Sequence, residues 1–397
     1  MSIKLYPRLK ADIGWCEIAA ATFPTTGAVS KFEQAFAPAF ECQYGTMFAL
    51  GRTALFALLK VWGLENSEII CPAYTCVVVP HAIVKSGNIP VFVDSEQEGF
   101  NMDLNQLEAT INPRTRVIIS THIFGYPLDI CRLMDIIARA EKKFGHKIYV
   151  IQDAAHSFGA RSQGQLVTAV GDAAIFGLNI SKVMTSIFGG MAITNDRETD
   201  EKLKAFRITN CRKTPLKGLS RWIYLVAVCV AFNPYVYRIV NWLENSKLLD
   251  RFVKYYDEGI IDFPADWDTM PTATEASVGL VQLKKYPEIV KARIDNAHQW
   301  IKNLTGKEVS FMPEIPGCTF SHCVGIVKDR AAWVEKFRSQ GYQLGILIEY
   351  SVPEMQTYQK FKRTEYPRAF YLKDHCINFP VWPDIIINTE KVNHNVN

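Results

Sequence analysis

The sequence predicts an α/β protein whose large domain is built on a mostly parallel sheet and whose smaller C-terminal domain is α+β. Three observations predict this fold class. Helical and strand patterns alternate from about residue 30 to 200, which is typical of a parallel sheet covered on both faces. A new alternation begins after about residue 263 with a long helical pattern. The chain of 397 residues is also too long for one core.

The elements of the large domain follow one another in the first 200 residues. Apolar residues recur at helical spacing over residues 32–37 and 53–62, and short β-branched runs between later turns indicate buried strands. An amphipathic helix over Leu128–Phe144 separates the last two strands. The predicted strands are Glu68–Cys71, Ile89–Asp94, Arg116–His122 and Lys147–Asp153.

The later residues predict a different arrangement. A helix over Thr274–Lys291 comes first, and strands near Ser321–Val327 and Leu344–Tyr350 then flank a helix over Arg330–Ser339. We therefore assign residues 1–206 to the large domain, 207–262 to an apolar helical insert and 263–397 to the small α+β domain.

Composition limits the classes of function. The net charge of +4 is small for this length and no dense Lys/Arg tract is present, so nucleic acid is not expected as a partner. The ten cysteines are scattered without a CxxC pair, which predicts no metal site and a reducing compartment. The N-terminal residues have no apolar signal segment, and the expected location is therefore cytoplasmic.

Two residues at predicted strand ends suggest a specific chemistry. Asp153 ends an apolar strand, and a second apolar run, Ala173–Phe176, leads to Lys182. Ligands of open α/β sheets bind outside the carboxyl ends of the strands, so both side chains are expected in one crevice. Pyridoxal 5′-phosphate (PLP) needs a lysine to bind its aldehyde and an aspartate to keep its ring nitrogen protonated. The ordinary alternative is a surface lysine and an aspartate that caps the next helix.

Further segments resemble the DegT/DnrJ/EryC1/StrS family of PLP-dependent sugar aminotransferases. The resemblance rests on five segments that occur in the family's order with compatible spacing. One of them, Gln152-Asp-Ala-Ala-His-Ser-Phe-Gly-Ala160, contains Asp153, and another contains Lys182 and the Gly-Gly pair seven residues after it. The other matching segments are residues 51–58, residues 71–94 and Thr121–Asp129.

This resemblance implies the fold-type-I PLP-transferase architecture, with a large sheet of the seven-stranded type. It also implies that Lys182 binds PLP and moves a proton during the reaction, while Asp153 stays ionised beside the ring nitrogen. His156 replaces a family glutamine near O3′, and the helix start at residues 51–53 suits the cofactor phosphate. The predicted cofactor-binding residues are Gly51, Arg52, Thr53, Tyr74, Cys76, Asp153, His156, Ser181 and Lys182.

The chain departs from the family at four places. Gly177 stands where a phosphate-binding serine or threonine is usual, and Cys76 where an aromatic residue stacks on the ring; Tyr74 is a candidate substitute. Met270 lies in the segment that replaces an Asn-x-Arg-Met motif for the partner subunit's site, and residues 348–353 replace a His-Tyr substrate element. The cofactor core is kept, whereas the substrate-facing parts differ.

The insert contains an unusual apolar run. Residues 222–232 carry no charge, Asn233-Pro234 interrupts them, and aromatic residues continue to Leu243. The run is shorter than the ~20 residues that span a bilayer. Lys213, Lys217 and Arg221 precede it, so residues 222–243 are a candidate for contact with the inner surface of a membrane. The alternative is a helical pair that packs on a partner subunit or covers the active site.

Together these observations predict a homodimeric aminotransferase. It would transfer an amino group from an amino acid, with glutamate as the first candidate, to a keto group of a sugar or sugar-like substrate in surface-glycan or secondary-metabolite synthesis. Two alternatives are another PLP outcome, such as elimination or dehydration, and a degenerate membrane-associated scaffold without turnover. Lys182 argues against the related dehydratases, which have histidine at that position.

Overall fold

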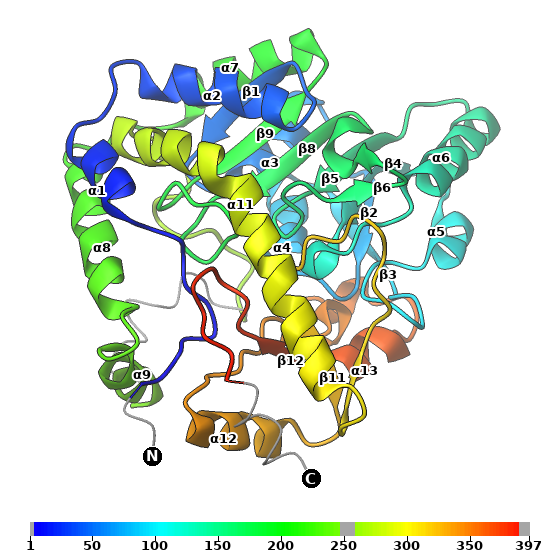
Figure 1. Cartoon of the computed structure of the whole chain (residues 1–397). Helices are drawn as coiled ribbons and strands as arrows, with labels where there is room; N and C mark the ends of the chain where they lie inside the picture. Colours follow the sequence, from blue (N-terminus) through cyan, green and yellow to red (C-terminus); the bar gives the residue numbers. More distant parts are fainter. Residues whose placement is uncertain (1–3, 247–258, 389–397) are drawn as a thin grey trace.

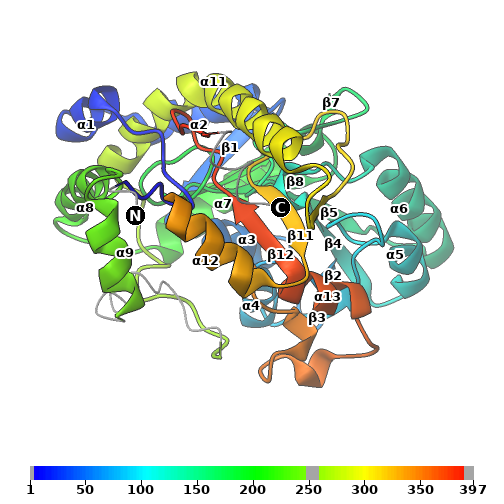
Figure 2. The same cartoon turned by 60° about the horizontal axis from the view of Figure 1, so that its bottom comes forward.

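Two sheets organise the molecule in the computed structural model, which describes residues 4–246 and 259–388 (Figure 1). The larger sheet has seven strands, and the smaller has three antiparallel strands. Figure 2 shows α12 and α13 beside the smaller sheet. This arrangement confirms the predicted α/β fold class with a mostly parallel large sheet and a small C-terminal sheet.

The large sheet has the strand order β1-β9-β8-β5-β4-β2-β3. All neighbouring pairs are parallel except the two that β9 forms with β8 and with β1. The carboxyl ends of β2, β4, β5 and β8 therefore lie along one edge of the sheet. The strands are β1 (Tyr44–Phe48), β2 (Glu68–Pro72), β3 (Ile89–Val93), β4 (Thr115–Thr121), β5 (Tyr149–Asp153), β8 (Ala173–Gly177) and β9 (Gly190–Thr194).

Successive residues of these strands pack on opposite faces of the sheet. In β4, Val117 and Ile119 face the core that contains α3 and α4, whereas Ile118 faces the core that contains α5 and α6. Because both faces are covered, the strands read as continuous apolar runs in the sequence. The first helices are α1 (Trp15–Thr22), α2 (Ala28–Ala39), α3 (Gly51–Val61), α4 (Val78–Lys85), α5 (Leu104–Thr110), α6 (Ile130–Phe144) and α7 (Arg197–Asn210).

Helix α6 shows how local residues set the element boundaries. The Asp129 carboxylate accepts a hydrogen bond from the amide of Arg132, and Gly145 ends the helix in the left-handed conformation. An acidic N-cap and a glycine at the C-terminus are the usual boundaries of a helix. The helix begins two residues later than the sequence pattern predicts.

Helix α11 (Ala273–Leu304) connects the two sheets and crosses the face of the molecule in Figure 1. Its first half packs with α2 through Ala276 and Ile289, and its second half packs with the small sheet through Trp300. It extends 13 residues beyond the predicted end at Lys291. The remaining elements are α8 (Lys217–Ala231), α9 (Tyr237–Asn245), β10 (Val309–Phe311), β11 (Cys323–Val327), α12 (Arg330–Gln340), α13 (Pro367–His375) and β12 (Cys376–Phe379), and a hairpin of β6 (Arg161–Ser162) and β7 (Gln165–Leu166).

The strand predicted over Leu344–Tyr350 is wrong. Only Gly345 pairs with a strand, through two hydrogen bonds to Asn378 of β12. The chain then turns away from the small sheet, because the amide of Val352 bonds to the Ala73 carbonyl after β2 at 3.0 Å. The apolar residues of this segment pack between the two sheets and do not form a strand.

The described part of the insert contains helices α8 and α9, which lie with α1 along one side of the molecule (Figure 1). Among the described residues, no helix combines the length and the hydrophobicity that crossing a bilayer requires. Residues 247–258 of the predicted insert lie outside the described residues. The domain boundaries at 206 and 262 stay a prediction.

Candidate active site

Asp153 and Lys182 meet at the carboxyl edge of the large sheet. Asp153 is the last residue of β5, which pairs in register with β8, and Lys182 lies five residues after the end of β8. Burial lowers the pKa of the Lys182 amine, and the neighbouring Cys76 and Asp153 raise it. The sheet therefore brings together the two residues on which the PLP prediction depends.

The Asp153 carboxylate is buried and hydrogen-bonded. Oδ1 accepts from the amide of Ala155 at 3.0 Å, and Oδ2 lies 3.5 Å from the hydroxyl of Thr121. Burial raises the pKa of Asp153, whereas the Ala155 amide, the Lys182 charge and the Thr121 hydroxyl lower it. A carboxylate held in this way suits a cationic partner such as a protonated ring nitrogen.

His156 lies in the same buried place. Its Nδ1 accepts from the amide of Phe124 at 3.4 Å, and its ring stacks on the Phe124 ring. Burial and the charge of Lys182 hold the pKa of His156 well below its usual value, so the ring is neutral. With Nδ1 as acceptor, Nε2 carries the proton and can donate to a ligand oxygen.

The start of α3 lies against the end of β8. A Cβ added to Gly51 would be 3.0 Å from the Phe176 carbonyl oxygen, and one added to Gly190 would be 2.3 Å from the Gly51 amide nitrogen. Both glycines thus permit a close backbone approach that a side chain would prevent. The amides of Thr53 and Ala54 bond to the Leu50 carbonyl at 3.1 and 3.2 Å, and the positive end of the α3 helix dipole beside Lys182 favours an anion at this position.

Gly177 explains one departure from the family pattern. A Cβ added here would lie 3.3 Å from Cε of Lys182, which is tighter than most Cβ contacts. A serine or threonine at this position would press on the lysine side chain. The α3 amides are the remaining candidates to hold the cofactor phosphate.

Three predicted cofactor-binding residues make contacts within the protein. The hydroxyl of Thr53 donates to the Trp267 carbonyl at 2.8 Å, and that of Ser181 donates to Asn179 Oδ1 at 2.6 Å. The charge of Arg52 lowers the pKa of the buried His81. Their amides also have acceptors, the Leu50 carbonyl for Thr53 and Asn179 Oδ1 for Ser181, each at 3.1 Å, so a role of either residue towards a cofactor would require a change of partners.

Cys76 and Tyr74 lie in different surroundings. The charge of Cys76 acts on Lys182, whereas Tyr74 is fully buried beside Phe124 and directs its phenol towards Cys376 of β12. The structure thus favours Cys76 over Tyr74 as the residue beside the cofactor ring. The hydroxyl of Tyr350 accepts from the amide of Val77 at 3.0 Å, which brings the rewritten segment 348–353 next to Cys76.

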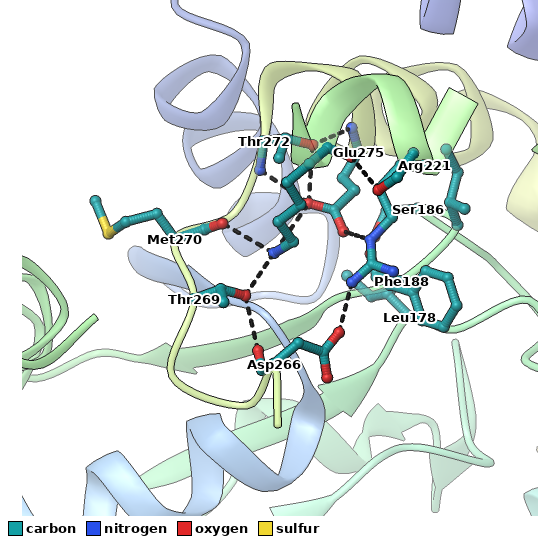
Figure 3. A network of polar contacts seen from close by, with 12 residues as sticks. Leu178, Ser186, Phe188, Arg221, Asp266, Thr269, Met270, Thr272 and Glu275 are labelled. Atoms are coloured by element: carbon teal, nitrogen blue, oxygen red, sulfur yellow. Dashed lines mark hydrogen bonds and ion pairs between the residues drawn. The ribbon is translucent and has the colours of Figure 1, made fainter. Parts of the chain in front are cut away.

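A buried ion network joins the insert to the active-site loop (Figure 3). The Glu275 carboxylate accepts from Arg221 Nε at 3.0 Å, and its other oxygen lies 3.7 Å from Lys217 Nζ. The Arg221 guanidinium also stacks on the ring of Phe188, in the loop that follows Lys182, at 4.0 Å. Helix α8 is therefore fixed to α11 and to the loop of the predicted cofactor lysine.

The same network holds the segment that replaces the family's Asn-x-Arg-Met motif. Lys217 Nζ donates to the Thr269 hydroxyl at 2.8 Å and to the Met270 carbonyl at 2.9 Å, and Arg221 pairs with Asp266 at 2.7 Å. Lys217 and Arg221 are thus directed into the protein. The prediction that they face lipid headgroups is wrong, because the buried Glu275 attracts both cations.

A family model described as the DegT/DnrJ/EryC1/StrS aminotransferase family matches residues 17–233, more than half of the chain. The chain belongs to this family. It is 31% identical over 180 residues to a GDP-perosamine synthase of Escherichia coli O157:H7, covering 45% of this chain and 48% of that protein. A GDP-perosamine synthase of Vibrio cholerae is 25% identical over 365 residues, covering 90% of this chain and 86% of that protein. The alignment with the first relative thus spans about half of its length.

A solved structure shows the same fold. AtS13 from Actinomadura melliaura has a TM-score of 0.78 at 24% identity, and the superposition covers 99% of this chain and 98% of that one. Family membership confirms the predictions of a PLP-dependent aminotransferase family and of PLP as its cofactor. Within residues 4–246 and 259–388, no three His, Cys, Asp or Glu side chains are placed to hold a metal ion.

The residues present fit this cofactor. Lys182 is half-buried within reach of the Asp153 charge, and the glycine-lined start of α3 lies beside the same lysine. These positions supply an amine for the aldehyde, an anion for the ring nitrogen and amides for the phosphate. No sequence motif marked His322, whose pKa the charge of Lys182 lowers, or Arg293, which donates to the carbonyl of the adjacent Ser321. Their only signal was the position of His322 in a predicted strand of the small domain.

Proposed function

We propose that this protein is a PLP-dependent aminotransferase that takes its amino group from an amino acid, with glutamate as the first candidate. The acceptor would be a keto group of a sugar or sugar-like substrate in surface-glycan or secondary-metabolite synthesis. The donor would lose its amino group and its Cα hydrogen and become a 2-oxo acid. The keto carbon would gain an amino group and a hydrogen and lose its oxygen as water, while the 2-oxo acid takes its oxygen from another water, so atoms and electrons balance.

The single observation that carries this proposal is the half-buried Lys182 beside Asp153 at the sheet edge. When bound, PLP supplies an aldehyde that links amino groups and a ring that withdraws electrons from Cα. Because burial lowers the pKa of Lys182, its Nζ can take the Cα proton and return it to the carbon that bore the aldehyde. Asp153 would keep the ring nitrogen protonated, and His156 would donate Nε2–H to the ring oxygen.

Two measurements test the proposal. The purified protein should absorb visible light, and addition of L-glutamate alone should remove that band, because the amino group moves in the first half of the reaction. Borohydride reduction followed by peptide mapping should place the cofactor on Lys182. Lys182→Ala should abolish both signals, whereas Lys213→Ala, at an exposed lysine, should keep them.

The alternatives give other results. A protein that binds no PLP would support the scaffold interpretation, and ammonia release or loss of a substrate hydroxyl would indicate elimination or dehydration. Label on a different lysine would overturn the assignment of Lys182.

We also propose a homodimer, as the family resemblance implies, and contact between α8–α9 and the inner surface of a membrane in an otherwise cytoplasmic protein. Helix α8 directs its charges inward and exposes Leu219, Ile223 and Val230 by 53–58%. In α9, Ile239 and Trp242 are 63% and 64% exposed. A helix with a polar inner face and an aliphatic outer face favours an apolar covering surface.

Because Lys217 and Arg221 bind Glu275, this contact would depend on apolar side chains rather than on anionic lipid. Flotation with neutral and with anionic vesicles should therefore give similar binding that high salt does not abolish. The pair Ile223→Glu and Trp242→Glu should lose binding. Ile315→Glu should keep vesicle binding, because Ile315 is an exposed isoleucine in the loop after β10. A dimer that buries this surface and leaves vesicles unbound would refute membrane contact.

A further inference from the structure

His322 brings a second imidazole to the surroundings of Lys182. It lies directly before β11, and its ring centroid is 5.3 Å from that of His156 and 5.8 Å from that of Phe124. The charge of Lys182 helps to lower the pKa of His322 and of His156, the ring that His322 contacts. His322 is only partly buried, so it lines the site rather than the core.

The hydrogen bonds of His322 leave one nitrogen for a ligand. Nδ1 lies 3.1 Å from the hydroxyl of Ser321. Burial, Arg293 and Lys182 hold the pKa of the ring well below its usual value, so it is neutral. When the Ser321 hydroxyl donates to Nδ1, the ring proton is on Nε2, which can donate to an oxygen in the site.

Arg293 places a positive charge behind this imidazole. It is 5% exposed, and its Nη1 donates to the Ser321 carbonyl at 2.8 Å, whereas Nε has no partner among the described residues. The nearest carboxylate to influence its pKa is Asp12, which instead pairs with Lys285 at 3.0 Å. A buried guanidinium without a paired carboxylate is costly, and an anion bound nearby would offset that cost.

We propose that His322 and Arg293 form the binding position for the α-carboxylate of the amino donor. His322 Nε2–H would bind a carboxylate oxygen directly, and Arg293 would supply the compensating charge as a positioning residue. The inference rests on the proposed function. It makes His322 a specificity-determining residue that selects α-amino acids over simple amines.

The position relative to Lys182 favours a carboxylate over a phosphate. The α-carboxylate is one bond from Cα, the atom at which Lys182 would exchange a proton. The phosphates of a nucleotide sugar are several bonds from the reacting carbon, so they must bind farther from the lysine. His322, which lies beside both Lys182 and His156, is therefore in a position to bind the α-carboxylate.

The test compares two amino donors that differ only in the α-carboxylate, L-glutamate and 4-aminobutyrate. The loss of the visible band with either donor alone reports this half of the reaction without a sugar. His322→Ala should raise the glutamate concentration for half-maximal conversion by about 10- to 100-fold, the range for hydrogen bonds to a charged group, and change conversion of 4-aminobutyrate little. His322→Gln, which keeps an N–H donor, should recover part of the loss. Arg293→Lys should show a smaller loss.

A binding measurement gives a readout that does not depend on turnover. Calorimetry of the cofactor-loaded protein should show weaker binding of glutarate, an unreactive dicarboxylate, in His322→Ala. The histidine Cε1–H signal of His322 in NMR should titrate at higher pH when glutarate binds, because a nearby carboxylate stabilises imidazolium. His298→Ala is the matched control, since this half-exposed histidine on α11 bonds to Glu314 at 2.9 Å.

The outcomes separate the two proposals. A wild-type protein that converts no amino acid would refute the proposed function. A wild-type protein that converts glutamate, with an equally active His322→Ala variant, would refute this inference alone. If His322→Ala impaired only the return reaction with a nucleotide sugar, the bound anion would be phosphate and the carboxylate assignment would be wrong. Should Arg293 variants fail to fold, the His322 series decides alone.

Discussion

Gly190→Ala should weaken the cofactor site by displacing the start of α3. The added methyl group would lie 2.3 Å from both the Gly51 amide nitrogen and the Leu50 carbonyl carbon, and all three nearest atoms belong to the backbone. Because Cβ atoms do not approach backbone within 3.0 Å, the strand and the helix start must separate by about 0.7 Å or more. The amides that we assign to the phosphate would move with the helix.

The energetic cost follows from the rigidity of these atoms. Overpacking a dense core costs about 1–3 kcal/mol, and backbone cannot relax as a flexible side chain does, so we expect about 3 kcal/mol of lost unfolding free energy. Urea unfolding of the cofactor-free protein measures the loss of unfolding free energy. PLP titration by visible absorbance measures the loss of cofactor affinity. Gly14→Ala is the control, because its added Cβ would meet only Glu17 Oε2 at 3.7 Å.

A Gly190→Ala variant that unfolds within about 0.5 kcal/mol of the wild type would mean that β9 and α3 are not in the contact described. Normal stability with lost PLP affinity would retain the phosphate assignment but refute the magnitude. Normal PLP affinity with reduced stability would show that the α3 amides do not bind the cofactor phosphate.

Three further predictions concern buried charge. Asp153→Asn should keep the fold and lower the rate of the glutamate half-reaction by about 10³-fold, because the ring nitrogen loses its anion; near-normal turnover would show that another residue serves it. Glu275→Gln should lower the free energy of unfolding by about 3 kcal/mol, because Lys217 and Arg221 would lose their shared carboxylate. An unchanged midpoint in thermal or urea unfolding would mean that the network adds no stability. Burial lowers the pKa of His122 to about 4, so between pH 6.5 and 4 the unfolded chain binds a proton that the folded chain does not. His122 alone should therefore lower stability by about 1.4 kcal/mol per unit as the pH falls through that window, so the slope should be shallower by this amount in His122→Gln. An equal slope in both proteins would contradict the neutral ring.

Much of the large domain could be predicted because its strands are buried on both faces. Such strands appear as short apolar runs whatever their partners, and Asp153 ends one of them. The segment Leu344–Tyr350 has the same apolar character without a ladder, since its contacts are with residues after β2. Local pattern therefore identifies burial and does not identify the surface against which a segment is buried.

The parts of the site that the sequence analysis missed depend on distant residues. His322 reaches the surroundings of Lys182, and Arg293 reaches Ser321 beside His322, through packing of the small sheet and α11 on the large sheet. The inward orientation of the Lys217 side chain could not be predicted either, because cations on an apolar helix are normally exposed. Here the buried Glu275 reverses that preference. Each case needs knowledge of a contact between elements that are far apart in the chain.

The pairing of β1 with β9 has a consequence for synthesis of the protein. Tyr44 pairs with Thr194, and β1 has no other neighbour in the large sheet, so it must wait for about 150 further residues to be translated. At the usual rates of elongation this delay is on the order of 10–30 s. During that interval an apolar strand emerging from the ribosome has no native partner, and it can pair with other nascent chains. Slower translation before residue 190 should therefore reduce the yield of folded protein, and a chaperone that shields residues 44–48 should restore it.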